Sequence, residues 1–421
     1  MAKFIKQRGT IDLYDAEALV YQRIIDVCHQ QASLYNFKPI VVPTFESTAL
    51  YTRSTGETSD IVTKEMYDFK DKSGRDITLR PEGTAGVIRA VIENKLYATN
   101  DLPLKYHYDG SFFRYERPQV GRYREFMQFG VEVIGTTSYL DDVESILLIA
   151  SILKNLNISK YNIRINTFGN ESCRNAHRDA IKSFFAPHIE NLCEDCKNRF
   201  LKNPLRILDC KVDKEYIEQL KIPVSMDSLD DENRETFDKI LKILKENQIN
   251  FEIDPYLVRG LDYYTGIIFE VDIALSDGKV LTIGGGGRYS NLVKELDGPD
   301  LSCVGFGLGV NRLALILQDL YGKDNFDVNA KYYIMPFDEN SYEIAIKIAL
   351  SLRNQGEHVI LETNKKSIGS MFKFASKHHF QLAIMIGEEE IKNQVVKIKN
   401  LLTQEQFFVS IEELLGGQWN G

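Results

Sequence analysis

The sequence predicts an α/β protein of two domains, in which an α+β domain is followed by a smaller mixed α/β domain. Three patterns indicate this: helical periodicity near the N-terminus, a long hairpin after it, and short strands alternating with helices beyond residue 330. The 421 residues are enough for two or three domains at about 150 residues each. Hydrophobic residues (43%) and charged residues (26%) are balanced as in an ordinary globular protein, which argues against disordered, collagen-like and disulfide-scaffold classes.

The charge and the apolar pattern limit the possible partners. Lys and Arg number 51 against 60 Asp and Glu, for a net charge of −9, so binding to a polyanion must use local basic patches. We find no apolar run long enough for a membrane span and no apolar core of a signal peptide. The six cysteines fit a reduced compartment. We therefore expect a cytoplasmic protein without a membrane partner.

Elements at the start of the chain follow from periodicity. Apolar residues spaced near 3.6 predict a helix over residues 12–35, with Asn36 as a left-handed stop. A short extended run, 40–42, ends at Pro43, and a second helix is expected over 139–154.

A β-hairpin is predicted between these helices, with arms at 105–116 and 124–134. Alternation places Gln128, Gly130 and Glu132 of the second arm on one face. A glutamine and a glutamate on either side of a glycine make a polar floor with room above it. A solvated sheet face is the alternative interpretation.

The first arm and the hairpin connection carry Arg114, Glu116 and Arg122. Arginine forks suit phosphate oxygens, and a nearby carboxylate can accept a hydrogen bond from an exocyclic amine. A surface cluster of paired charges is the alternative.

A turn-like segment, Leu79 to Thr84, precedes an apolar helix. Thr84 is a candidate N-cap for that helix, which would explain Thr84 without a function but leaves Glu82 unexplained.

Two later segments combine glycines with arginines. Arg259 precedes the paired Tyr263 and Tyr264 at the start of a strand, although an isolated arginine there is often structural. Four glycines at 284–287 indicate a tight turn or the close approach of another group.

Glycines at 305, 307 and 309 would leave one strand face bare, so that a flat ring could lie on it, and Arg312 sits in the first turn of the next helix. Close backbone packing is the alternative. The same GFGLG run is a weak match to a dinucleotide fingerprint, because no complete βαβαβ pattern surrounds it.

Residues 170–250 differ in character and predict an inserted helical module with Cys193, Cys196 and Cys210. His188 could complete a zinc site, but the second paired cysteine knuckle of usual structural sites is missing, so thiols without metal are expected.

The segment after a polar linker at 326–330 alternates strands and helices over 331–421. Lys366, Lys373 and Lys377 fall on one face of a helix expected over 366–378. A basic face is a reasonable contact for a phosphate backbone, and a solvated lysine face is the alternative.

Together these segments resemble histidyl-tRNA synthetases, a family of class II aminoacyl-tRNA synthetases. RGTID (8–12) matches the segment that opens the family's chain. Three further matches are generic to class II synthetases: residues 16–43 as motif 1, FRYERPQ (113–119) as motif 2 and GFGLGVNRL (305–313) as motif 3. LVRGLDYYT (257–265) and GGGRY (285–289) are specific to the histidine enzymes, and LRPEGT (79–84) supports them.

The resemblance implies a class II catalytic domain over residues 1–325, with an antiparallel sheet flanked by helices and the helical insertion at about 170–250. The linker at 326–330 and an anticodon-binding domain over 331–421 would follow. The implied reaction is ATP-dependent ligation of L-histidine to tRNA(His) through histidyl adenylate, with release of AMP and pyrophosphate. ATP with Mg²⁺, a homodimer and a cytoplasmic location are also implied.

The resemblance assigns site residues by matching position. Catalytic roles fall to Arg259 and Arg114. ATP would be bound by Arg114, Glu116, Arg122 and Arg312. Histidine would be bound by Glu82, Gly83, Thr84, Gln128, Glu132, Arg259, Tyr263 and Tyr264. Lys366, Lys373 and Lys377 would contact tRNA, and no resident metal is expected. Asn311 stands where motif 3 usually has a glutamate.

A histidine-binding regulatory subunit of ATP phosphoribosyltransferase is the main alternative. Such paralogues typically lose motif arginines and the C-terminal domain, whereas this chain keeps Arg114, Arg259 and Arg312 and continues for about 90 residues. A dinucleotide-dependent oxidoreductase, based on GFGLG alone, has less support.

Overall fold

The computed structural model describes residues 4–56, 59–261, 263–322, 330–417 and 419. The chain divides into two compact units, residues 1–326 and 327–421, which we describe separately. The linker expected at 326–330 lies almost entirely outside the described residues.

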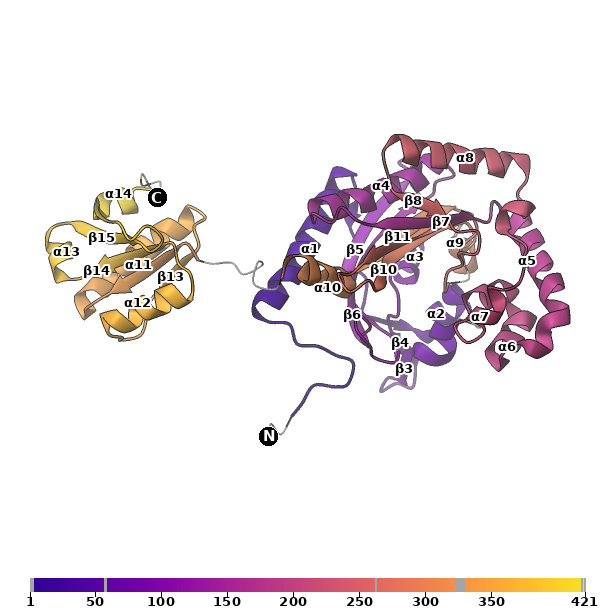
Figure 1. Cartoon of the computed structure of the whole chain (residues 1–421), viewed down its shortest axis with the longest axis horizontal. Coiled ribbons are helices and arrows are strands. Elements are labelled where there is room, and N and C mark those ends of the chain that lie inside the picture. The colour runs from indigo at the N-terminus through magenta and orange to yellow at the C-terminus, as the bar shows by residue number, and fades with distance from the viewer. Residues whose placement is uncertain (1–3, 57–58, 262, 323–329, 418, 420–421) are drawn as a thin grey trace. The chain divides into compact units, whose positions relative to one another are not determined.

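An eight-stranded sheet organises the first unit, in the order β1-β5-β6-β11-β10-β9-β7-β8 (Figure 1). The two outermost pairs are parallel and the inner pairs are antiparallel. The strands are β1 (Lys38–Pro39), β5 (Leu104–Phe113), β6 (Glu125–Ile134), β7 (Asn162–Thr167), β8 (Phe251–Ile253), β9 (Ile267–Ala274), β10 (Val280–Tyr289) and β11 (Cys303–Gly309). The antiparallel sheet flanked by helices is therefore confirmed.

Four helices cover one face of this sheet: α1 (Asp15–Leu34), α4 (Tyr139–Asn155), α8 (Asp231–Glu246) and α10 (Val310–Tyr321). Their apolar faces pack on the inward side chains of β6, β9 and β11, including Phe129, Val131 and Phe306. The predicted helices at 12–35 and 139–154 are confirmed, and Asn36 has the left-handed φ of +62° expected of a stop.

The opposite face is covered by α3 (Thr84–Glu93), α9 (Leu292–Glu295) and three helices of the insertion expected at about 170–250. These three are α5 (Glu171–Phe185), α6 (Glu194–Lys202) and α7 (Lys214–Ile217), joined by 3-10 turns, whereas α8 of the same region packs on the first face. At its edge lie α2 (Thr48–Thr55) and a three-stranded sheet of β2 (Phe45–Ser47), β3 (Tyr67–Lys70) and β4 (Asp76–Leu79). None of the helices in the described part of the chain has the length and apolarity needed to cross a membrane.

The hairpin of β5 and β6 is shorter in its first arm than expected. β5 ends at Phe113 instead of residue 116, so Arg114 and Glu116 lie in the connection and not on a strand face. The connection turns back on itself through hydrogen bonds between Arg114 and Arg124 and between Gln119 and Arg122. It can therefore place its charged side chains independently of the strand alternation.

The second unit has a five-stranded sheet in the order β13-β12-β14-β15-β16. The strands are β12 (Tyr332–Pro336), β13 (Val359–Leu361), β14 (Leu382–Ile386), β15 (Val395–Asn400) and β16 (Gln406–Ser410). The helices are α11 (Tyr342–Asn354), α12 (Ile368–Lys377), α13 (Glu388–Lys392) and α14 (Ile411–Leu415). The mixed α/β pattern predicted for this region is confirmed.

Candidate active site

A row of residues without side chains crosses the middle of the large sheet. Gly130 on β6 lies directly opposite Gly307 on β11, which in turn lies opposite Gly285 on β10. Residues with side chains flank this row of glycines: Tyr108 on β5 lies opposite Gly130, and Glu270 on β9 lies opposite Gly285. Two adjoining cavities, of about 200 and 60 Å³, open above this floor.

These glycines are strand residues and do not form the tight turn that was one of the two expectations. A Cβ on Gly285 would lie 2.1 Å from Nη1 of Arg259, and one on Gly130 would lie 2.4 Å from the Tyr108 ring. The other expectation, the close approach of another group, is therefore confirmed. β11 pairs antiparallel with both neighbours, which excludes the dinucleotide fold suggested by GFGLG.

Glu132 lies at the bottom of the smaller cavity and is 1% exposed. Its carboxylate accepts hydrogen bonds from Thr84 Oγ1 (2.7 Å), Tyr108 OH (3.1 Å) and Tyr289 OH (2.5 Å). Burial raises the pKa of Glu132 to about 8, against the lowering effect of these donors. A buried carboxyl that binds or releases a proton near neutral pH suits recognition of an imidazole, which titrates in the same range.

Glu82 caps the helix that borders this cavity. Its carboxylate accepts from the backbone N–H groups of Thr84 (2.7 Å) and Ala85 (2.9 Å) at the start of α3. The prediction that Thr84 is the N-cap is wrong: Gly83 occupies that position, and the Thr84 hydroxyl is directed to Glu132. Burial raises the pKa of Glu82 despite those bonds.

Aromatic rings close the smaller cavity. Tyr263 packs against Tyr264 with 4.7 Å between ring centres, and against Tyr289 with 5.2 Å. Burial raises the pKa of all three hydroxyls, so they stay protonated donors at neutral pH.

Gly83 also belongs to this cavity because a Cβ there would lie 2.1 Å from the Tyr108 ring. The structure thus brings Glu82, Gly83, Thr84, Gln128, Glu132, Arg259, Tyr263 and Tyr264 to one cavity.

The larger cavity is lined by four arginines, two of which pair with the carboxylate of Glu116. Glu116 lies 3.5 Å from Arg122 Nη1 and 4.0 Å from Arg114 Nη1. Arg312 reaches the same cavity from α10 and donates to the backbone carbonyls of Gly121 and Thr282. Burial and then the Arg122 charge lower the pKa of Arg312. Four arginines against two glutamates on the cavity wall leave an excess of positive charge, which suits a polyanion such as a triphosphate.

Arg259 stands between the cavities and lines both, as do Arg114 and Gln128. Its Nη1 donates to the Phe269 carbonyl (3.1 Å) and lies 3.3 Å from Oε1 of Glu270, while its buried Nε has no partner among the residues that the structure describes. With that donor unused by the described residues, the guanidinium retains hydrogen-bonding capacity for an anion at the junction.

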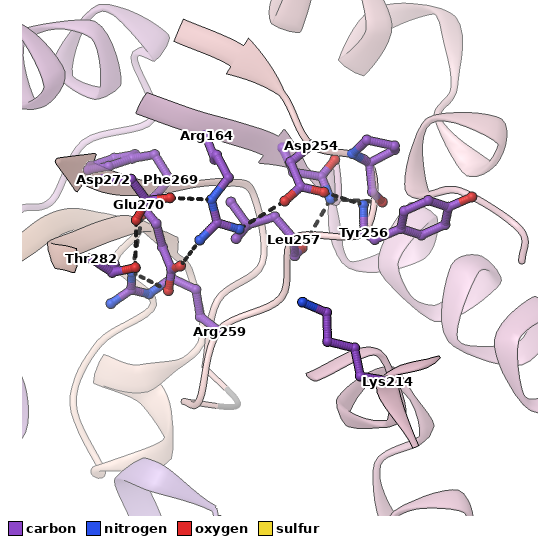
Figure 2. Close-up of polar contacts among 12 residues, drawn as sticks. Arg164, Lys214, Asp254, Tyr256, Leu257, Arg259, Phe269, Glu270, Asp272 and Thr282 are labelled. Carbon is purple, nitrogen blue, oxygen red and sulfur yellow. Dashed lines mark hydrogen bonds and ion pairs between the residues drawn. The ribbon is translucent and has the colours of Figure 1, made fainter. Parts of the chain in front are cut away.

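A second arginine holds Glu270 from behind (Figure 2). Arg164 on β7 contacts Glu270 (2.7 Å), Asp272 (2.7 Å) and Asp254 (2.9 Å). Asp272 in turn accepts from the Thr282 hydroxyl at 2.5 Å. Arg164 is therefore linked to Arg259 through Glu270, and to Arg312 through Asp272 and Thr282.

Asn311 at the start of α10 links this helix to strand β6 beside the larger cavity. Its side-chain oxygen accepts a hydrogen bond from the backbone N–H of Met127 at 2.7 Å, and its side chain is buried. A carboxylate in this place would accept the same bond, so the asparagine keeps the connection between β6 and α10 without a charge. Met127 itself lines the larger cavity and also packs against the hydrophobic core.

The three lysines predicted to contact tRNA, Lys366, Lys373 and Lys377, do not share one helix. α12 begins at Ile368, so Lys366 precedes it, and the expected helical face is wrong for this residue. Lys366 Nζ contacts the buried Glu362 at 2.6 Å because the segment before the helix folds back over that carboxylate. Lys373 and Lys377 do lie on α12 and are exposed.

Tyr108, Tyr289 and Glu270 are among the cavity residues that the sequence did not assign to the site. Tyr289 could have been predicted from the sequence because it ends the GGGRY segment. Tyr108 and Glu270 could not, because only the register between neighbouring strands brings them to the floor of the cavities.

Comparisons with known proteins agree with this geometry. The family model described as histidyl-tRNA synthetase matches residues 9–313, and one described as an anticodon binding domain matches residues 331–417. The histidine--tRNA ligase of Thermosipho melanesiensis is 41% identical over 98% of this chain and 97% of its own. That of Malacoplasma penetrans is 43% identical over 97% and 96%.

Among solved structures, the histidyl-tRNA synthetase of S. aureus matches with a TM-score of 0.83 at 32% identity, over 98% of this chain and 99% of that one. A Bacillus halodurans protein titled as an ATP phosphoribosyltransferase regulatory subunit/histidyl-tRNA synthetase matches at 22% identity and a TM-score of 0.66, over 92% and 99%, which shows only a shared fold. By the family match over most of its length and by these relatives, the chain belongs to the histidyl-tRNA synthetase family.

Proposed function

We propose that the protein ligates L-histidine to tRNA(His) in two steps, forming histidyl adenylate from histidine and ATP and then transferring the histidyl group to tRNA. The observation that carries this proposal is the pair of cavities that share Arg114, Gln128 and Arg259 as a common wall. A small amino-acid pocket beside a basic nucleotide pocket is the arrangement that adenylate formation needs, because the reacting groups must meet at the shared wall.

Histidine occupies the smaller cavity in this proposal. Glu132 and Tyr264 face its imidazole, with Tyr263 beside them, while Glu82, Thr84 and Gln128 bind its polar ends. A site that hydrogen-bonds both imidazole nitrogens rejects apolar amino acids, because they would leave its buried polar groups unpaired. The buried Glu132 carboxyl and its three hydroxyl donors support this orientation.

ATP occupies the larger cavity. Glu116 accepts from the adenine amino group, Arg114 holds the α-phosphate, and Arg122 and Arg312 hold the outer phosphates. Mg²⁺ would enter with ATP and would offset the negative charge of its phosphates; Glu270, a carboxylate on the cavity wall, would hold such an oxygen-preferring ion.

The histidine carboxylate attacks the α-phosphorus, and the bond to the pyrophosphate oxygen breaks. Arg114 and Arg259 are the catalytic residues in this proposal, since they offset the negative charge that develops at the shared wall. In the second step the terminal ribose hydroxyl of tRNA attacks the histidyl carbonyl, and AMP leaves.

The second unit matches an anticodon-binding family model, so we assign it the tRNA contact. Lys373 and Lys377 on α12 are the exposed cations we propose for the phosphate backbone, with Lys366 just before that helix. We assign the helical insertion to the acceptor stem. Its deletion should then spare adenylate formation and reduce tRNA charging, and an equal loss of both would contradict that assignment.

We propose that the enzyme is a cytoplasmic homodimer that pairs through the motif 1 region. Leu34, Val41 and Phe45 around that segment are 73, 95 and 58% exposed, which is unusual for apolar side chains grouped near one another in the chain. Val41→Lys should yield monomers in light-scattering chromatography, whereas Val280→Lys, at an exposed valine on β10, should not. Dimers of both variants would contradict this surface.

The deciding experiment is ATP–pyrophosphate exchange with each amino acid in turn. Exchange with histidine alone, abolished by Arg259→Ala, would support the adenylate step, and charging of tRNA(His) would complete the test. Histidine binding without exchange would instead favour the regulatory-subunit alternative, which has less support because the histidine--tRNA ligase relatives match over nearly the whole chain.

A further inference from the structure

Four potential metal ligands meet in the helical insertion, away from both cavities. They are Cys193, Cys196, Cys210 and Asp213, and one ligand atom from each lies within 4.8 Å of the others. The sequence had suggested His188 as the fourth member, which the structure contradicts: its Nδ1 is 2.8 Å from the Tyr216 hydroxyl instead.

The four residues form two facing pairs with the same spacing. Cys193 is the N-cap of α6 and Cys196 lies in its first turn, whereas Cys210 follows a 3-10 turn and Asp213 is the N-cap of α7. Each pair therefore has the C-x₂-C or C-x₂-D spacing that brings two ligands to one side of a tight turn. The second knuckle that the sequence lacked is present, with a carboxylate in place of a thiolate.

The distances between ligand atoms suit a tetrahedral ion. With metal–sulfur bonds of about 2.3 Å, two sulfurs of a tetrahedral zinc site are separated by about 3.8 Å, and a sulfur and a carboxylate oxygen by about 3.6 Å. Cys193 Sγ and Cys210 Sγ are 3.7 Å apart, and Cys210 Sγ and Asp213 Oδ2 are 3.5 Å apart. The ligand atoms that are farthest apart are within 4.8 Å of each other, so they would have to approach by at most about 1 Å to reach the separation of a tetrahedral site.

The backbone around the cluster is arranged for thiolates. The N–H of Asp213 points to Cys210 Sγ at 3.3 Å, and the N–H of Cys196 donates to Cys193. Asp213 Oδ2 accepts from the backbone N–H of Cys193 at 3.0 Å, which ties one knuckle to the other. Such donors around the ligating atoms orient them and moderate their charge.

We propose that Cys193, Cys196, Cys210 and Asp213 bind one structural zinc ion that joins the two knuckles of the insertion. Thiolate ligands favour zinc over the oxygen-preferring Mg²⁺ and Ca²⁺, and the four ligands leave no open position for a substrate. Binding releases the thiol protons to solvent, with no change in oxidation state.

The ion would cross-link segments that are otherwise held by the packing of their buried side chains, among them Leu205, Ile207 and Ile217. The segments that it joins are short, since α6 has nine residues and α7 has four. Lys214, at the start of α7, lies across a cavity from Arg164 and Asp254 (Figure 2). A fixed knuckle would therefore hold one wall of that cavity in place.

Metal content of the full-length protein, purified without a polyhistidine tag from zinc-supplemented medium, tests the proposal. We expect about one zinc per chain in the wild type and in Cys173→Ser, a buried cysteine of the same insertion outside the cluster. Cys196→Ser and Cys210→Ser should lose at least about four-fifths of the metal. A metal-free wild type that also takes up no zinc would overturn the proposal.

Cobalt substitution keeps the test independent of whether the serine variants fold. Wild-type protein with Co²⁺ should show thiolate-to-cobalt charge transfer and the intense visible bands of four-coordinate cobalt. Asp213→Cys should raise the charge-transfer intensity by about one third, in proportion to four thiolates instead of three. Weak octahedral bands, or a spectrum unchanged in Asp213→Cys, would overturn the ligand set.

Discussion

Arg164 is predicted to position Arg259 through Glu270, although it touches neither cavity. It contacts three carboxylates whose side chains are 24, 22 and 13% exposed, and is itself 26% exposed. Removing one partner of a buried ion pair costs about 3–5 kcal/mol, and the partial exposure here places Arg164→Met near about 3 kcal/mol. Urea unfolding followed by circular dichroism measures this loss.

The same change should affect catalysis beyond its effect on folding. Without Arg164, Glu270 has Arg259 as its remaining cation and draws that guanidinium away from the shared wall of the cavities. We expect a fall of at least about tenfold in kcat for pyrophosphate exchange, equivalent to about 1.4 kcal/mol, under conditions where the variant is fully folded. Glu270→Gln, which also removes the carboxylate proposed for Mg²⁺, should cost less in the Arg164→Met background than in the wild type, because the charge that competes for Arg259 is gone.

Arg53→Met serves as the matched control, since Arg53 pairs with Asp297 on the exposed surface at 2.8 Å. Its loss should cost less than about 1 kcal/mol and leave exchange unchanged. The positioning role of Arg164 is refuted if the folded Arg164→Met protein keeps wild-type kcat, or if its effect and that of Glu270→Gln simply add.

Three further perturbations follow from the site and the second unit. The pKa of Glu132 is raised to about 8 in the folded protein, above its ordinary value of 4.5. Protonation of Glu132 therefore stabilises the folded state fully below pH 4.5, and this stabilisation is lost as the pH rises through 8. Glu132→Gln should reduce the decline in unfolding free energy between pH 5.5 and 8.5 by more than about 1.4 kcal/mol, as measured by urea titrations. Asn311→Ala should cost about 1–2 kcal/mol in thermal unfolding, since it removes the 2.7 Å acceptor of a strand N–H, whereas Asn311→Asp should cost less. The double variant Lys373→Ala, Lys377→Ala should raise KM for tRNA several-fold and spare pyrophosphate exchange, with Lys347→Ala on α11 as control; equal KM values would contradict the contact.

The helices and most strands could be predicted because their signals are local. Apolar periodicity gave α1 and α4 within a few residues, and the alternation in β6 identified the polar face that holds Gln128 and Glu132. Strand β10 shows the limit of such reasoning. Four consecutive glycines disfavour a strand locally, and only pairing on both sides keeps Gly284 to Gly287 extended.

The parts of the site that escaped prediction depend on contacts between distant segments. Thr84 is a good N-cap by its own preference, but the carboxylate of Glu82 takes that role and frees the hydroxyl for Glu132. Asp213 did not stand out as a ligand because a pattern of cysteines does not include carboxylates. In both cases the residue type indicated a polar role correctly. Which role the side chain takes is decided by its partner from a distant segment, Glu132 for Thr84 and the three cysteines for Asp213.

Specificity and chemistry are joined in this enzyme by the bare row of the sheet. Because Gly130, Gly307 and Gly285 carry no side chains, Tyr108 can lie over one end of the row and Arg259 over the other. Tyr108 donates to the carboxyl that is proposed to read imidazole, and Arg259 is proposed to meet the α-phosphate, so a ligand on the floor spans both. A larger side chain in the row would separate recognition of histidine from its activation, which is why the glycines belong to the mechanism as much as the charged residues above them.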